Sequence, residues 1–147
     1  MFLDDLEIIS ESTYMSGTQS VVRLKERTKF YNAKRTGKDL IIDNGQAFHG
    51  SMMDFWRKKT GLTESDVFSK CSNKDCPYHG DQFRYTLQGA HIVLDRDDVN
   101  LKSGAFVYIV PLCPECNNPN NSGEMEFAHD VKAPLLKWTV HNKAKKK

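Results

Sequence analysis

The residues best suited to chemistry in this sequence are its four cysteines, which form two close pairs, Cys71-x4-Cys76 and Cys113-x2-Cys116. Pairs of thiolates at such spacings are typical of a tetrahedral zinc site, with Zn–S distances of about 2.3 Å. Disulfides are the main alternative, because the number of cysteines is even, and free or redox-active thiols are another. However, the first residues lack the basic and apolar regions of a secretory signal peptide, and four cysteines among 147 residues are few for a disulfide-built protein. The spacing therefore predicts one structural Zn²⁺ ion bound by all four cysteines.

Length and charge constrain the kind of protein that carries these cysteines. A chain of 147 residues is expected to form one domain, with or without an N-terminal extension. The net charge of +2 does not by itself indicate a nucleic-acid-binding protein. Basic residues are nevertheless concentrated in residues 23–38 and after Asp130, and such patches could contact phosphate. For the C-terminal lysines the sequence favours the alternative, a solvated and disordered tail.

The sequence also bears on location and partners. No stretch approaches the length and apolar character of a transmembrane helix, so we expect no membrane partner. Zinc-bound thiolates suit a reducing compartment, so the cytoplasm is the expected location. The sequence does not indicate an oligomeric state.

The elements that must position the cysteines are mainly short strands. Apolar alternation and turn signals predict strands at residues 19–24, 39–42, 83–87, 91–94 and 106–110. A helix is predicted from Ser51 to Lys59, because Ser51 can cap it, Asp54 completes a capping box and Gly61 follows. A second, short helix is expected to begin at Cys113. The predicted fold is α+β, with a small β-rich N-terminal part followed by a zinc-stabilised treble-clef (ββα-metal-like) module.

This order of elements divides the chain into three expected segments. Residues 1–65 form an N-terminal α+β extension that packs on the zinc module. Residues 66–130 form the treble-clef module itself. Residues 131–147 form a C-terminal segment that ends in the lysine tail.

The order of motifs around the cysteines is Cys-x4-Cys, Ala90-His91-Ile92, a turn, and Leu112-Cys113-x2-Cys116-Asn117. Over residues 71–121 this order resembles the HNH, or His-Me finger, endonuclease family. The resemblance implies that His91 is the general base that activates water and that Asn117 is a ligand of a catalytic Mg²⁺. The position before His91, which holds a metal-binding Asp or His in that family, is Ala90 here. A methyl group cannot coordinate a cation.

Other side chains near these motifs have weaker candidate roles. Asp95, Asp97 or Asp98 could supply a displaced carboxylate for Mg²⁺, but acidic residues in a turn are more often solvated turn formers. His79, three residues after Cys76, is an alternative zinc ligand, although four thiolates already complete a tetrahedron.

Two functions are therefore predicted. The favoured one is a non-catalytic zinc module, degenerate at Ala90, that binds nucleic acid or a protein partner. The alternative is an active Mg²⁺-dependent HNH endonuclease in which His91 and Asn117 are catalytic. A carboxylate close to His91 in the fold would favour the enzyme.

Overall fold

A sheet of eight strands organises the part of the chain that the structure describes, which is residues 6–34, 40–43, 46–62, 71–76, 87–102, 104–118 and 123–146. In this computed structural model the strand order is β4-β3-β1-β8-β6-β5-β2-β7. The elements are β1 (Leu6–Leu24), β2 (Lys29–Asn32), β3 (Leu40–Asp43), β4 (Gln46–Ala47), α1 (Met52–Thr60), β5 (Gln88–Val93), the 3-10 turn η3 (Arg96–Asp98), β6 (Phe106–Leu112), β7 (Met125–Glu126) and β8 (Val131–Lys146). Paired strands run antiparallel except β1 and β3, which are parallel.

The predicted α+β fold with a treble-clef module is wrong. Strands dominate, and α1 is the only α-helix among the described residues. β5 and β6 do form the expected hairpin, but β6 also pairs with β8 on its other side, which incorporates the hairpin into the large sheet. The second cysteine pair lies in a turn after β6 instead of at the start of a helix. The described part of the protein is therefore a sheet with one covering helix.

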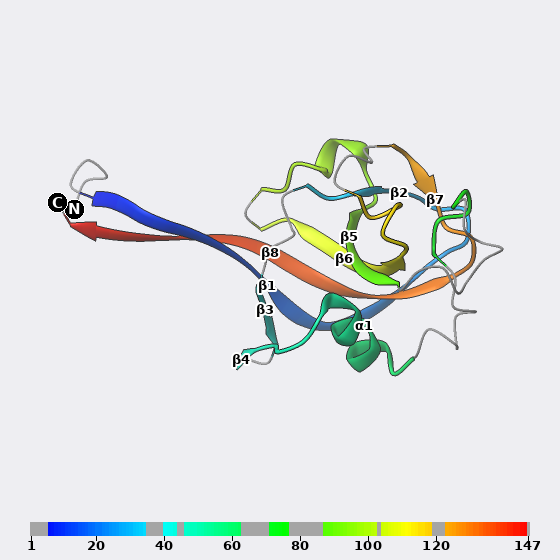
Figure 1. Cartoon of the computed structure of the whole chain (residues 1–147), viewed down its shortest axis with the longest axis horizontal. Coiled ribbons are helices and arrows are strands. Elements are labelled where there is room, and N and C mark those ends of the chain that lie inside the picture. The colour runs from blue at the N-terminus through cyan, green and yellow to red at the C-terminus, as the bar shows by residue number, and fades with distance from the viewer. Residues whose placement is uncertain are drawn as a thin grey trace.

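The first and last strands are much longer than the sequence indicates. β1 and β8 pair from Leu6–Lys146 to Leu24–Val131, with register shifts after Ile8 and Gly17. Figure 1 shows that their inner parts lie in the sheet, whereas their outer parts run away from it as a two-stranded ribbon. The lysine-rich segment, for which the sequence favours a disordered tail, is thus a paired strand as far as Lys146.

The predicted helix at residues 51–59 is confirmed as α1. The Ser51 hydroxyl accepts a hydrogen bond from the Asp54 amide, and the Asp54 carboxylate accepts one from the Ser51 amide, both at 3.0 Å. The capping box is therefore complete. Gly61, with φ of 70°, ends the helix in the left-handed conformation. α1 packs across β5, β6 and β8, and the Trp56 indole donates to the Lys132 carbonyl at 2.8 Å.

The central strands have two faces, because successive residues of a strand point to opposite sides. Gly89 and His91 lie on the face covered by α1, since a Cβ at Gly89 would lie only 2.5 Å from the Met52 carbonyl carbon. We call this the helix face. Gln88, Ala90 and Ile92 lie on the opposite face.

The face opposite α1 carries the second pair of cysteines, and we call it the cysteine face. Asn32, which is paired with Ile92 on this face, donates to the Cys116 carbonyl at 2.7 Å. Phe30 lies on the same side of β2 and stacks on Phe127, with ring centroids 4.2 Å apart. Both faces of β6 are therefore packed along most of the strand, as expected for a central strand rich in β-branched residues.

Candidate metal centre

The four cysteines come together as predicted. Their Sγ atoms all lie within 4.8 Å of one another, and all four residues are buried. The Sγ atoms of Cys76 and Cys113 are 3.5 Å apart. A tetrahedron with metal–sulfur bonds of about 2.3 Å has edges of about 3.8 Å, so the cluster has the size that one metal ion needs. The cluster could hold a metal ion through thiolates alone.

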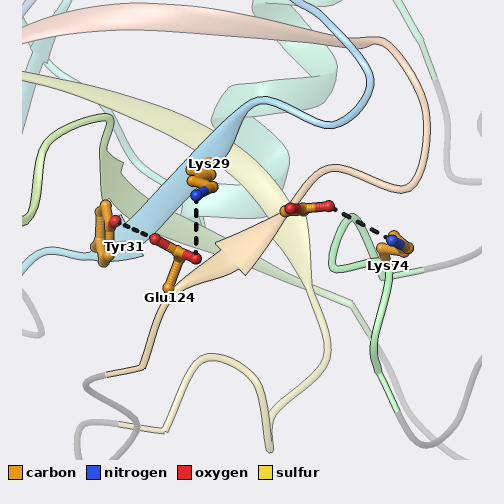
Figure 2. A network of polar contacts seen from close by, with 5 residues as sticks. Lys29, Tyr31, Lys74 and Glu124 are labelled. Atoms are coloured by element: carbon orange, nitrogen blue, oxygen red, sulfur yellow. Dashed lines mark hydrogen bonds and ion pairs between the residues drawn. The ribbon is translucent and has the colours of Figure 1, made fainter.

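The loop that carries the first cysteine pair is fixed by hydrogen bonds to two other segments. The Ser72 amide donates to the Pro111 carbonyl at 2.9 Å, and the Ser72 carbonyl accepts the Ala128 amide at 2.8 Å. The Lys74 amide donates to the Glu126 carbonyl at 2.8 Å, and the two side chains form an ion pair at 3.5 Å (Figure 2). The loop therefore sits on the end of β6 and on β7.

The second cysteine pair lies in a single turn that β6 leads into. The Asn117 amide donates to the Cys113 carbonyl at 2.9 Å, which closes one turn of helical type without continuing it. Pro119 follows, and the residue before a proline disfavours the helical conformation. This explains why the predicted helix at Cys113 does not form within residues 113–118.

Hydrogen bonds to sulfur prepare the cluster for negative charge. The Cys116 amide donates to Cys113 Sγ at 3.3 Å, and Asn73 Nδ2 donates to Cys116 Sγ at 3.4 Å. The hydrogen bond from the Cys71 thiol, followed by that from Asn73, lowers the pKa of Cys116. The same bond to Cys116 and burial raise the pKa of Cys71. A bound cation would replace the shared proton and let all four sulfurs be thiolates.

His91 is enclosed in the core on the helix face. Its side chain is buried, and Nε2 has no hydrogen-bond partner among the described residues. Burial alone lowers its pKa to about 4, so the imidazole is neutral at pH 7. A nearby carboxylate would oppose this shift, and no described acidic group contributes to it.

Asn117 is not brought together with His91. Its Nδ2 donates to Gln88 Oε1 at 3.0 Å, which places it on the cysteine face. Gln88 and His91 are three residues apart on β5 and therefore lie on opposite faces. Asp95 is occupied as the cap of η3, where its side chain accepts the Asp97 amide at 2.9 Å. His79 lies outside the described residues.

A polar network on β2 and at the start of β7 was not indicated by the sequence. The Tyr31 hydroxyl donates to Glu124 Oε1 at 2.7 Å, and Lys29 Nζ lies 3.6 Å from Glu124 Oε2 (Figure 2). The Arg96 guanidinium lies over the Tyr31 ring, 5.5 Å from its centroid. The bond from Tyr31 lowers the pKa of Glu124 and raises that of Tyr31. The network joins β2 to the start of β7, and only the weak alternation of residues 29–32 could have suggested it.

Comparison of this chain with family models, with curated proteins and with solved structures finds no match. The described part of the chain contains no helix with the length and apolar character needed to cross a membrane.

Proposed function

We propose that this protein is a non-catalytic nucleic-acid-binding module whose sheet is held together by one structural Zn²⁺ ion. The observation that carries the non-catalytic part is the separation of His91 and Asn117 onto opposite faces of β5. The nucleic-acid part is supported by basic side chains that form no ion pair among the described residues.

The donor set supports zinc. Four sulfur ligands with no open position are typical of structural zinc sites, whereas catalytic sites keep one position for water. Soft thiolates also select zinc or iron–sulfur clusters over magnesium or calcium. The bound ion would hold the loop at Cys71–Cys76 against the end of β6, and it would supply no reaction.

The surroundings of His91 argue against metal-dependent hydrolysis. A general base must reach the water that it deprotonates, but His91 is 8% exposed and lies beneath α1. A catalytic Mg²⁺ needs oxygen ligands, usually carboxylates, and Asn117 offers only an amide on the far side of the strand. These two residues therefore cannot share one cation.

Unneutralised charge supports a nucleic-acid partner. Lys102, Lys132 and Lys137 are exposed, and none of them forms an ion pair among the described residues. Two of these lysines lie on β8, whose sequence continues with Lys143, Lys145 and Lys146. Phosphate contacts from such residues provide sequence-independent affinity that weakens steeply with salt.

Three measurements test this proposal. Elemental analysis of purified protein should give about one zinc per chain, as expected for a four-thiolate site. A coloured protein that contains iron would contradict the zinc assignment.

Binding to DNA and RNA should be measured over a series of salt concentrations. The proposal requires that the logarithm of the binding constant falls linearly with the logarithm of the salt concentration. Cleavage of plasmid DNA in Mg²⁺ that His91→Ala abolishes would overturn the non-catalytic assignment.

A further inference from the structure

We infer that the open end of the cysteine face, around Phe106 and Tyr108, is a stacking platform for single-stranded nucleic acid. This inference rests on the proposed function and names the surface and the form of nucleic acid.

Among the side chains whose exposure the structure describes, Phe106 is the most exposed large apolar one, at 53%. Tyr108, two residues along β6, lies on the same face and is half-buried. β6 is paired on both sides, with β5 and with β8, so its backbone is held firmly. The two aromatic side chains are therefore presented by a rigid central strand, which suits a site that must bind without reorganising.

Two lysines lie beside Phe106 on the side of β8. Lys137 is directly paired with Phe106, and both side chains are exposed. The turn of Lys102 is fixed to the same place, because the Gly104 amide donates to the Trp138 carbonyl at 2.8 Å. A Cβ at Gly104 would lie 4.0 Å from Lys137 Cε, so the stem of Lys137 lies over this turn. Aromatic rings with adjacent cations are the combination that binds bases and backbone phosphates together.

The charge around the platform differs between its two sides, and this difference indicates on which side the nucleic-acid backbone lies. On the side of β5 the turn η3 follows, in which Asp97 and Asp98 outnumber Arg96. On the side of β8 lie Lys137, which is paired with Phe106, and the turn of Lys102. Phosphates are repelled at the first side and attracted at the second. The nucleic-acid backbone therefore lies on the side of β8, with the bases over Phe106 and Tyr108.

The platform favours unpaired bases over duplex. The faces of bases inside a duplex are covered by their neighbours, so Phe106 cannot stack on them. Residues two apart on a strand are separated by about 7 Å, which is about twice the rise of one stacked base of about 3.4 Å. The two rings therefore suit bases that are splayed apart, as in flexible single strands. Stacking of this kind tolerates any sequence.

The test measures fluorescence anisotropy of labelled oligothymidylate and of a labelled duplex of equal length with the full chain. The wild-type protein should bind the single strand more tightly. Phe106→Ala should weaken that binding by about 5- to 150-fold, the effect of one lost base stack, and Phe106→Trp should retain it. Val21→Ala is the matched control, because Val21 is 39% exposed but is paired with Pro134 on the helix face. Lys137→Ala should reduce the salt slope by about 1.

Several outcomes would overturn the inference. Equal binding by wild type and Phe106→Ala would show that the platform is not used. Equal or tighter binding of duplex would contradict the single-strand assignment but leave the proposed function intact. If neither probe binds, the proposed function itself fails. Sedimentation of the same samples tests whether a second copy of the chain occupies the platform instead. If the wild type is a dimer that Phe106→Ala dissociates, and oligonucleotide binding is unchanged, the platform is a self-association surface.

Discussion

The two ends of β6 are both apolar in sequence, but one end is exposed and the other is covered. Phe106, Tyr108, Val110 and Leu112 alternate along one face, and their exposure falls from 53% at Phe106 to 0% at Leu112. At the Leu112 end the cysteine cluster and its loop cover the sheet, whereas nothing among the described residues covers Phe106 to the same degree. Apolar alternation thus locates the strand, but the covering segments decide which of its residues are core. The predictions below test how strongly the two ends differ.

Removing one metal ligand should have the largest effect. Cys113→Ser should abolish stoichiometric zinc binding and cost most of the stability of the cysteine end, because binding energy at structural zinc sites, on the order of 10 kcal/mol, is coupled to folding. Metal content and thermal unfolding with and without chelator provide the measurement.

Ser72→Ala is the control for that change. Ser72 adjoins Cys71, and its buried hydroxyl has no hydrogen-bond partner among the described residues, so its loss should be nearly neutral. A Cys113→Ser protein that retains one zinc and the wild-type melting temperature would contradict the metal centre.

Truncation at the two ends of β6 compares them directly. Leu112→Ala should destabilise the protein by about 2–5 kcal/mol, because it opens a cavity at a fully buried position. Phe106→Ala should change the unfolding free energy by only about 0.5 kcal/mol, since the side chain is exposed. Urea denaturation measures both. Similar losses at the two positions would mean that the Phe106 end is covered by something else, such as a second copy.

A substitution where α1 approaches the helix face closely should produce the next largest loss of stability. Gly89→Ala should cost about 1–3 kcal/mol, because its Cβ would overlap the Met52 backbone and push the helix away from the sheet. Gly61→Ala is the matched control. Gly61 has free space for a Cβ, so this substitution should lower the free energy of unfolding by only about 1 kcal/mol, because of the positive φ of the residue. If Gly61→Ala were the more harmful change, the packing of α1 on β5 would be different from that described.

The buried His91 should produce a smaller, pH-dependent effect. Its pKa is about 4 in the folded protein and 6.5 when unperturbed, so the unfolded state binds a proton first as the pH falls. Stability is therefore fully present above pH 6.5 and is lost as the pH falls towards 4. Between pH 7 and 5.5 the loss should be about 1 kcal/mol. Urea denaturation of wild type and His91→Leu should show a weaker pH dependence in the variant, and parallel curves would contradict the burial of His91.

The local signals of the sequence were sufficient for some elements. Ser51, Asp54 and Gly61 predict both ends of α1, because capping depends on residues close in sequence. The strand at β6 follows from its β-branched and aromatic residues. The cysteine cluster follows from spacing alone, since a metal site constrains where its ligands can be.

Other parts depended on partners far away in the sequence. The segment from Val131 to Lys146 contains Pro134 and many lysines, so it has no strong strand signal of its own. It is a strand because β1, more than 100 residues earlier, pairs with it along its whole length. The face on which His91 lies likewise depends on the packing of α1 against Gly89. The order of the motifs predicts that His91 and Asn117 belong to one site, but the alternation of side chains along β5 places them on opposite faces of the sheet.

The pairing of β1 with β8 also has a kinetic consequence. Leu24 and Val131 are the innermost pair of this ladder, so closing it requires a loop that contains nearly all the other elements. Long-range pairing of this kind slows folding, whereas the β5–β6 hairpin closes over a short distance. During synthesis the hairpin and both cysteine pairs leave the ribosome before β8 does. We therefore expect metal capture to precede completion of the sheet, with β1 the last early element to find its partner.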